Sequence, residues 1–134
     1  MAIIPDFKLP TKLARETLPE TYTKEDVVFN ISRVSMLILS LISGNEENLK
    51  TALDDKIHEP YRLKLIPEID EIEKIIADSP AIGHYLSGAG SSIMVILKSN
   101  DTESEKLIKN KLKELSANYK IMPLEIDKRG AFLI

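Results

Sequence analysis

The sequence contains no cysteine and no tryptophan, and it has only five glycines in 134 residues. Without cysteine the chain can form neither a disulfide nor a thiolate metal site, which suits a cytoplasmic protein. The longest apolar region, residues 34–42, contains two serines and is much shorter than the roughly 20 residues that span a bilayer. We therefore expect no membrane partner.

An excess of basic charge is also missing. Lysine and arginine together number 18 against 21 acidic residues, which gives a formal net charge of −3. The lysines between residues 106 and 113 are flanked by glutamates, a pattern typical of a solvated helix face. Few aromatic rings are available to stack on bases. We expect no nucleic-acid partner, since such proteins usually carry a basic stripe.

The hydrophobic pattern predicts an α+β domain. Two apolar segments, AIGHYL and SIMVILK, surround a glycine-rich stretch and predict a strand hairpin. Helical patterns precede and follow this hairpin, and further strands are expected near residues 2–7 and 120–127. A helix-covered antiparallel sheet with extra helices inserted after its first strand resembles a ferredoxin-like fold.

The clearest helix is expected over residues 24–43. Thr23 is a suitable N-cap, and Gly44 fits the position just past the C-terminus. Apolar residues recur at helical spacing at Val27, Ile31, Val34, Ile38 and Leu41. This period predicts a buried stripe, and we place the second half of the helix deep in the core.

Arginine is scarce, and guanidinium groups bind carboxylates or phosphates through two parallel hydrogen bonds. Arg33 lies three residues after Asn30 on the apolar helix, so the two share a face. Arg62 follows His58 in a segment broken by prolines. On these grounds each arginine is a surface residue or a ligand-binding one, and His58 is structural or catalytic. No His, Asp and Glu set has metal-ligand spacing, so we predict no protein-only metal site.

The stretch SGAGSS, residues 87–92, is open to two interpretations. It lies between two expected strands rather than before a helix, so it lacks the helix N-terminus of a P-loop. A plain hairpin loop would explain it. Two glycines within three residues also leave backbone N–H groups uncovered, which could form an anion-binding nest.

Several segments together resemble a known family. NISR, DDKIHEPYR, LSGAGSS and the closing DKRGA are similar, in order, to the C-terminal half of the homoserine kinases, a group within the GHMP small-molecule kinases. The resemblance implies transfer of the γ-phosphoryl of ATP, with Mg²⁺, to the side-chain hydroxyl of L-homoserine, in threonine biosynthesis. Ser91 stands where the family commonly has proline.

The same resemblance implies roles for particular residues. Arg33 and Arg62 match the arginines that hold the substrate carboxylate. His58 and Asn30 would lie in the same site, either touching the substrate or orienting a neighbour. The loop that closes on the substrate and supports the nucleotide phosphates would consist of Ser87, Gly88, Ala89, Gly90 and Ser91.

The chain departs from these kinases in one respect. Their N-terminal half carries the phosphate-binding loop and the residues around Mg²⁺, and we find neither motif here. We therefore expect residues 1–134 to be a single GHMP-type C-terminal domain without catalytic residues of its own. Alone, it would bind no ATP or Mg²⁺ and would be inactive. Its partners would be the missing N-terminal half and L-homoserine, with a homodimer as a further arrangement open to it.

Two alternatives stay open at this point. The chain could belong to another GHMP kinase whose substrate lacks an amino-acid end. It could instead be a non-enzymatic ferredoxin-like module that senses an amino acid, which the absence of a phosphate-binding motif would favour.

Overall fold

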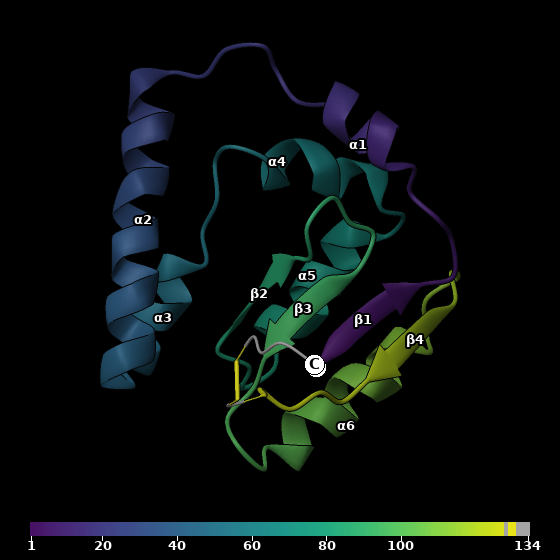
Figure 1. Ribbon diagram of the computed structural model, residues 1–134. Coiled ribbons are helices and arrows are strands. Elements are labelled where there is room, and N and C mark those ends of the chain that lie inside the picture. Colours follow the sequence, from purple (N-terminus) through teal and green to yellow (C-terminus); the bar gives the residue numbers. More distant parts are fainter. Residues whose placement is uncertain (128, 131–134) are drawn as a thin grey trace.

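The computed structural model describes residues 1–127 and 129–130. Four strands form one antiparallel sheet in the order β2-β3-β1-β4 (Figure 1). The strands are β1 (Ala2–Pro5), β2 (Gly83–Leu86), β3 (Ile93–Ile96) and β4 (Tyr119–Met122). β1 lies in the middle, where Ala2 is paired with Met94 on one side and Met122 on the other. The α+β, ferredoxin-like arrangement expected from the sequence is confirmed.

Helices α5 and α6 cover one face of this sheet (Figure 1). The main core lies between these two helices and the sheet. It includes residues without solvent exposure, such as Ile3, Ile72, Ile93 and Ile108. The helices are α1 (Thr11–Glu16), α2 (Lys24–Ser43), α3 (Glu46–Ala52), α4 (Glu59–Arg62), α5 (Ile69–Ala77) and α6 (Thr102–Leu112), with a 3₁₀ turn at Leu63–Leu65.

Local chemistry sets both ends of α2. The Thr23 hydroxyl accepts a hydrogen bond from the Asp26 amide at 3.1 Å, as expected of an N-cap. Gly44 ends the helix with φ 69°, a left-handed conformation that glycine adopts without strain. The next residue, Asn45, caps α3 by accepting the Asn48 amide at 2.9 Å.

The expectation that α2 is buried is wrong. Ser40 is its one buried residue, and its main neighbour among the helices and strands is α3. The whole apolar stripe lies exposed, and Ile31 for example is 63% exposed. A helical period shows that a face is suited to burial, but it does not say that the same chain supplies the cover. The exposed apolar residues of α2 are Val27, Val28, Ile31, Val34, Ile38, Leu39, Leu41 and Ile42.

By length and composition alone, α2 could cross a membrane, and little of it is buried. The sequence analysis missed this property because it considered only the short apolar core of the helix. Core helices of soluble proteins can have the same length and apolar composition, but those helices are mostly buried. A surface helix of this composition therefore needs a cover, whether lipid or protein.

The β2–β3 hairpin carries the glycine-rich loop to the edge of the domain. Its tip rises beside α1 and α4 (Figure 1). α2 and α3 stand apart from the sheet, on the side of β2. The fold thus places the loop, α4 and the α2–α3 pair around one region of the molecule.

Candidate functional site

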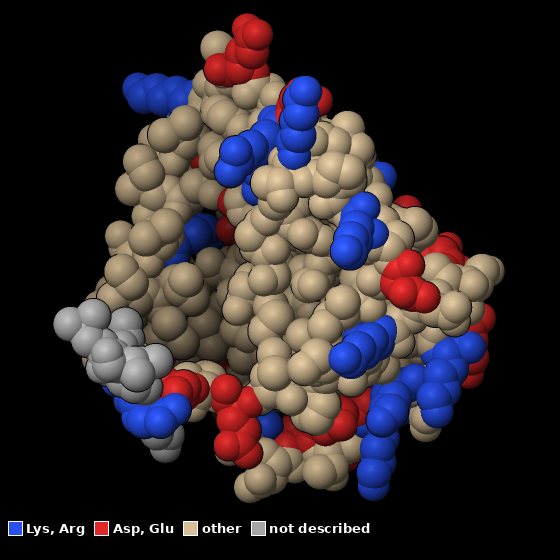
Figure 2. Space-filling view, turned by 45° about the vertical axis from the view of Figure 1, so that its right-hand side comes forward, with Lys and Arg blue, Asp and Glu red and all other residues tan. Residues whose placement is uncertain are grey.

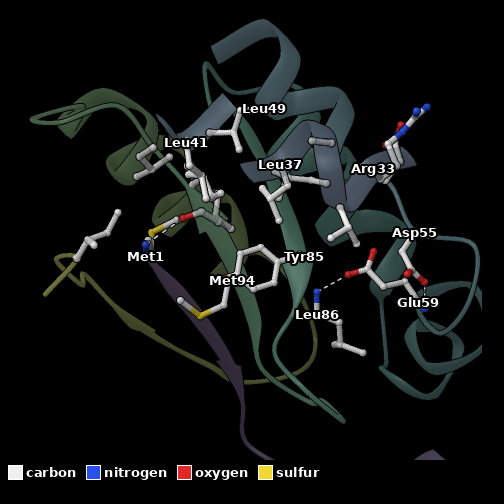
Figure 3. A pocket seen from close by; sticks show the side chains of 18 of the residues that line it. Met1, Arg33, Leu37, Leu41, Leu49, Asp55, Glu59, Tyr85, Leu86 and Met94 are labelled. Atoms are coloured by element: carbon white, nitrogen blue, oxygen red, sulfur yellow. Dashed lines mark hydrogen bonds between the residues drawn. The ribbon is translucent and has the colours of Figure 1, made fainter. Parts of the chain in front are cut away.

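A cavity of about 640 Å³ separates α2 and α3 from the sheet. Figure 2 shows it as a deep hollow with mostly uncharged walls and charged side chains at its inner end. Leu37, Leu41 and Leu49 face Tyr85 and Met94 across it (Figure 3). An apolar cavity with a few polar groups at one end is the usual form of a small-molecule site.

The polar end of this cavity brings together three of the residues singled out in the sequence. Asn30, Arg33 and His58 all line it. Asp55 and Glu59 also line this end, and Figure 3 shows the two close together, with the Arg33 side chain extending away from them. The helical spacing of Asn30 and Arg33 correctly predicted a shared face.

Arg33 is half-buried and has unused hydrogen-bonding capacity. Its Cζ lies 4.1 Å from the centre of the Phe29 ring, so the guanidinium stacks on that ring. Its Nε is buried, and no residue in the described part of the chain accepts a hydrogen bond from it. A buried donor without an acceptor is costly, and an anionic ligand would satisfy it once the atoms that shield this Nε move aside.

Asp55, which the sequence analysis did not single out, organises the backbone of this end. Its Oδ1 accepts hydrogen bonds from the amides of Ile57, His58 and Glu59 at 2.6–2.9 Å. Its Oδ2 accepts from the Asn30 side chain at 2.5 Å. Burial alone would raise the pKa of Asp55, but these hydrogen bonds outweigh it and hold the pKa below its usual value. Asp55 thereby joins α2 to the start of α4.

Asn30 and His58 are both held by this network. The Asn30 side-chain oxygen also accepts the Lys56 amide at 2.9 Å. His58 stands at the N-cap position of α4, and its Nε2 lies 3.7 Å from Asp55 Oδ2. Its Nδ1 is buried and has no hydrogen-bond partner among the described residues. In the part of the chain that the structure describes, this nitrogen therefore has neither a partner nor access to solvent, and a ligand would reach it only after its neighbours move.

Glu59 is the second functional candidate that sequence reasoning missed. It is 9% exposed, and its Oε1 accepts a hydrogen bond from the Leu86 amide at 2.5 Å. Burial raises the pKa of Glu59 to about 7, and the nearby Asp55, Glu73 and Asp54 carboxylates contribute to that rise. A buried glutamate in an otherwise polar segment has no signal in the sequence, since only packing distinguishes it from a surface residue.

Arg62 lies elsewhere. It is not among the residues that line the cavity. Its Nε donates to the Ala14 carbonyl at 3.0 Å, and its Nη1 donates to the Gly88 carbonyl at 3.2 Å. In this arrangement Arg62 joins α4 to α1 and to the glycine loop. The two-arginine grip on one carboxylate stays a prediction.

The glycine loop has the backbone of a tight, partly open turn. The Ser87 amide donates to the Ser92 carbonyl at 2.9 Å, and the Gly90 amide donates to the Ser87 carbonyl at 3.0 Å. Gly88 and Gly90 have positive φ angles of 60° and 89°. A Cβ on Gly90 would lie 3.3 Å from the side chains of Leu86 and Leu9, so a larger residue would be crowded there.

The serines of the loop differ in exposure. Ser87 and Gly88 are exposed, whereas Ser91 is buried and donates its hydroxyl to the Phe7 carbonyl at 3.2 Å. Ser91 therefore anchors the loop to the segment after β1. The exposed Ser87–Gly88 portion is the part that can reach a ligand.

No group of three or more His, Asp and Glu side chains in residues 1–127 and 129–130 is arranged to hold a metal ion. Any bound metal would need further ligands from a substrate or another chain segment. The closing DKRGA segment lies partly outside the described residues, because Lys128 and residues 131–134 are not among them.

Comparison with known proteins identifies relatives over nearly the whole chain. A homoserine kinase from Clostridium acetobutylicum is 40% identical over 132 residues, which are 98% of this chain and 45% of that protein. A homoserine kinase from Petrotoga mobilis is 42% identical over 134 residues, which are 100% of this chain and 44% of that protein. The chain thus spans about half the length of the curated relatives it matches.

The fold agrees with these relatives. The crystal structure of a homoserine kinase from Cytophaga hutchinsonii superposes with a TM-score of 0.81 and 26% identity, covering 89% of this chain and 38% of that one. The family profile described as "GHMP kinases C terminal" matches residues 37–120. This match covers more than half of the chain and includes α4, the glycine loop, strands β2 and β3 and the start of β4. The chain belongs to the GHMP kinase family, in which it corresponds to the C-terminal region.

Proposed function

We propose that this chain is the substrate-binding C-terminal domain of a homoserine kinase, which transfers the γ-phosphoryl of ATP to the side-chain hydroxyl of L-homoserine. The observation that carries the proposal is the match to homoserine kinases along the whole chain together with the same fold. The reaction belongs to threonine biosynthesis, and we place the enzyme in the cytoplasm, where ATP is supplied.

The polar end of the cavity supports an amino-acid substrate. The unsatisfied Nε of Arg33 can donate to a carboxylate, and a guanidinium can bind both carboxylate oxygens. Asn30 and His58 lie in the same cavity end and would orient that substrate or its neighbours. Phosphoryl transfer depends mainly on positioning and charge stabilisation, so residues that hold the far end of a small substrate contribute to its rate.

The nucleotide and its metal ion would be held mostly outside this chain. ATP use follows from the family, and Mg²⁺ would accompany it as the ion that neutralises charge on the transferred phosphoryl group. The described residues offer no metal cluster, so we assign no Mg²⁺ ligand here. The exposed Ser87–Gly88 part of the glycine loop would face the phosphates and support them through backbone N–H groups.

The exposed face of α2 would pack against the N-terminal half of such a kinase. The relatives are about twice as long as this chain, and a helix this apolar is a poor solvent surface. A homodimer through α2 is the competing arrangement. Sedimentation of the complete kinase distinguishes a dimer from a monomer with a covered helix.

The experiment joins this chain to the N-terminal part of the Clostridium acetobutylicum relative and measures ADP formation. We expect activity that requires L-homoserine, little activity with alcohols that lack an amino-acid end, and none from the 134-residue chain alone. Activity with other alcohols but not homoserine would indicate a different GHMP kinase.

Calorimetry on the chain alone addresses the sensor alternative. We expect weak binding of L-homoserine or none, because half of the site is absent. Tight binding of an amino acid by the isolated chain would contradict the proposal and favour a sensing module.

A further inference from the structure

The short helix α4 contacts the glycine loop at two points. Glu59, its first residue, accepts the Leu86 amide at 2.5 Å, just before the loop begins. Arg62, its last residue, donates to the Gly88 carbonyl at 3.2 Å, within the loop. One turn of helix therefore holds both the base of the loop and its exposed portion.

The contact with Leu86 closes an otherwise open sheet edge. β2 is an edge strand, and Leu86 is paired with Ile93 of β3. The Leu86 amide donates to Glu59, and Leu86 itself is 3% exposed. A buried N–H at this position needs an acceptor, and Glu59 is the residue that supplies it.

Hydrogen bonds through Asp55 connect α4, the helix that carries Glu59, to α2. Asp55 accepts the Glu59 amide at 2.9 Å and the Asn30 side chain at 2.5 Å. A continuous set of hydrogen bonds therefore runs from Asn30 on α2, through Asp55 and Glu59, to Leu86 at the base of the loop. Arg33 lies three residues after Asn30, at the cavity end described above.

We propose that Glu59 is a positioning residue that fixes the glycine loop relative to the Arg33 end of the cavity. The inference rests on the proposed kinase function, because it assigns Glu59 to the site that would hold the two reacting molecules. Glu59 acts through the Leu86 amide and touches neither of them. Its two neighbours in the network, Asp55 and Asn30, hold it in place.

The surroundings of Glu59 make its contact with the loop sensitive to pH. Its pKa of about 7 means that it changes charge close to neutrality. A carboxylate accepts an N–H more strongly than a neutral carboxyl does, so the hold on Leu86 tightens as the pH rises. The charged or titratable groups that share the larger cavity with it are the Met1 amino terminus, Arg33, Asp54, Asp55, His58, Tyr85 and Glu125. Those that share the smaller one are Asp54, Asp55, Lys56, Lys64, Asp70, Glu73 and His84. Arg62 follows it on α4.

Amide NMR spectra of the 134-residue chain between pH 5.5 and 8.5 test this directly. In the unchanged chain we expect the Leu86 amide resonance to shift with a midpoint near 7. Glu59→Gln keeps an oxygen acceptor but cannot ionise, so the titration should disappear while Leu86 stays protected from hydrogen exchange. Glu59→Ala removes the acceptor, and exchange at Leu86 and Ser87 should accelerate by about tenfold or more.

Glu20→Gln is the matched control, because Glu20 is exposed and has no contact in this network. It should leave the Leu86 titration unchanged. Leu86 exchange that is no faster in a folded Glu59→Ala variant overturns the proposal, as does a Leu86 titration that survives in Glu59→Gln. Because Glu59→Gln retains the hydrogen bond, the second result does not depend on whether Glu59→Ala folds.

The same variants in the joined kinase separate this inference from the proposed function. Glu59→Gln should flatten the pH profile of kcat/KM for ATP between pH 6 and 8 and leave KM for homoserine within about twofold. If the kinase phosphorylates homoserine but a folded Glu59→Ala variant keeps the same kcat/KM for ATP, the positioning role is wrong and the function stands. If Glu59→Gln leaves the pH profile unchanged, the loop contact does not depend on the charge of Glu59. If Leu86 titrates but no kinase activity appears, the proposed function fails and the loop contact stands.

Discussion

Glu59 is the acid in this chain whose burial should most affect folding stability. Its folded-state pKa of about 7 lies above the usual glutamate value of 4.5. Between these values the folded chain holds a proton that the unfolded chain has released, so the free energy of unfolding falls as the pH rises from about 4.5 to about 7. Above pH 7 the full destabilising effect is present.

Urea unfolding of the 134-residue chain at pH 5 and pH 8 measures this effect. Between pH 5 and pH 8, the free energy of unfolding of Glu59→Gln should rise by about 1 to 2 kcal/mol relative to that of the unchanged chain. This is less than the full pKa difference would give, because solvent screens part of the electrostatic effect on Glu59. Glu20→Gln should show no such change. A difference between Glu59→Gln and the unchanged chain that stays constant with pH would contradict the prediction.

Arg33 is the residue for which the kinase proposal makes the sharpest kinetic prediction. In the joined kinase, Arg33→Ala should raise KM for homoserine by about 10- to 100-fold, because it removes a charge-assisted contact with the amino-acid end. KM for ATP should change little. Steady-state kinetics with each substrate varied in turn measures both.

Arg33→Lys separates charge from geometry. Lysine keeps the positive charge but cannot donate two parallel hydrogen bonds, so it should restore only part of the homoserine affinity. Arg15→Ala, an exposed arginine on α1, should leave both KM values unchanged. Equal effects of Arg33→Ala on the two substrates would show that Arg33 does not hold the amino-acid end.

At the residue scale, the sequence indicated functional residues only where the residue type itself is rare in this chain. Arg33 was singled out because arginine is rare and its helix is apolar. Asp55 and Glu59 were not, because their roles depend on burial and on partners distant in the sequence, which are the Asn30 side chain for Asp55 and the Leu86 amide for Glu59. Arg62 was assigned to the substrate on resemblance, and the structure joins it to Ala14 and Gly88.

Among the elements, those with local capping signals were predicted most closely. Thr23 and Gly44 act where the Thr23 side chain and the backbone freedom of glycine suggested. α4 and the 3₁₀ turn were missed, since elements of three or four residues carry no period. The prediction that α2 is buried was wrong, because burial depends on what packs against a helix and not on the helix alone.

The exposed stripe of α2 leads to a prediction about stability. Ile31→Lys in the 134-residue chain should change the free energy of unfolding by no more than about 0.5 kcal/mol, because Ile31 is 63% exposed and lysine is a good helix former. Ile72→Ala, at a fully buried position on α5, should cost about 2 to 5 kcal/mol. Urea unfolding of both variants makes the comparison.

A large loss of stability in Ile31→Lys would mean that the stripe is covered in solution, for example by a second copy. Repeating the measurement at several protein concentrations identifies that case, since the stability of a dimer depends on concentration.

At the scale of the whole molecule, the sequence indicated an antiparallel sheet but not which surfaces of the domain are left uncovered. The pairing of β2 with β3 follows from their short connection, whereas the pairing of β1 with β3 and β4 joins distant segments and was expected only from the ferredoxin-like order of elements. The cavity between α2 and the sheet has no counterpart in the pattern, since it depends on how far a helix stands from its neighbours. Only the resemblance to longer proteins indicated that part of this surface belongs to an interface.

This difference between the chain and its longer relatives predicts how the isolated domain behaves. The apolar stripe of α2 should make the 134-residue chain associate as its concentration rises and bind a hydrophobic dye. In the joined kinase the N-terminal half should cover the stripe and reduce both effects. Sedimentation and dye fluorescence measure this on the two proteins side by side.

The double variant Ile31→Lys/Ile38→Lys gives opposite expectations in the two contexts. In the isolated chain it should reduce association, because it places two charges within the stripe. In the joined kinase it should lower the melting temperature, because the same charges would be buried at the contact between the halves. Leu13→Lys, an exposed apolar position on α1, is the matched control and should do neither. If the double variant leaves the joined kinase unchanged, the N-terminal half does not cover α2, and a second copy becomes the occupant to test.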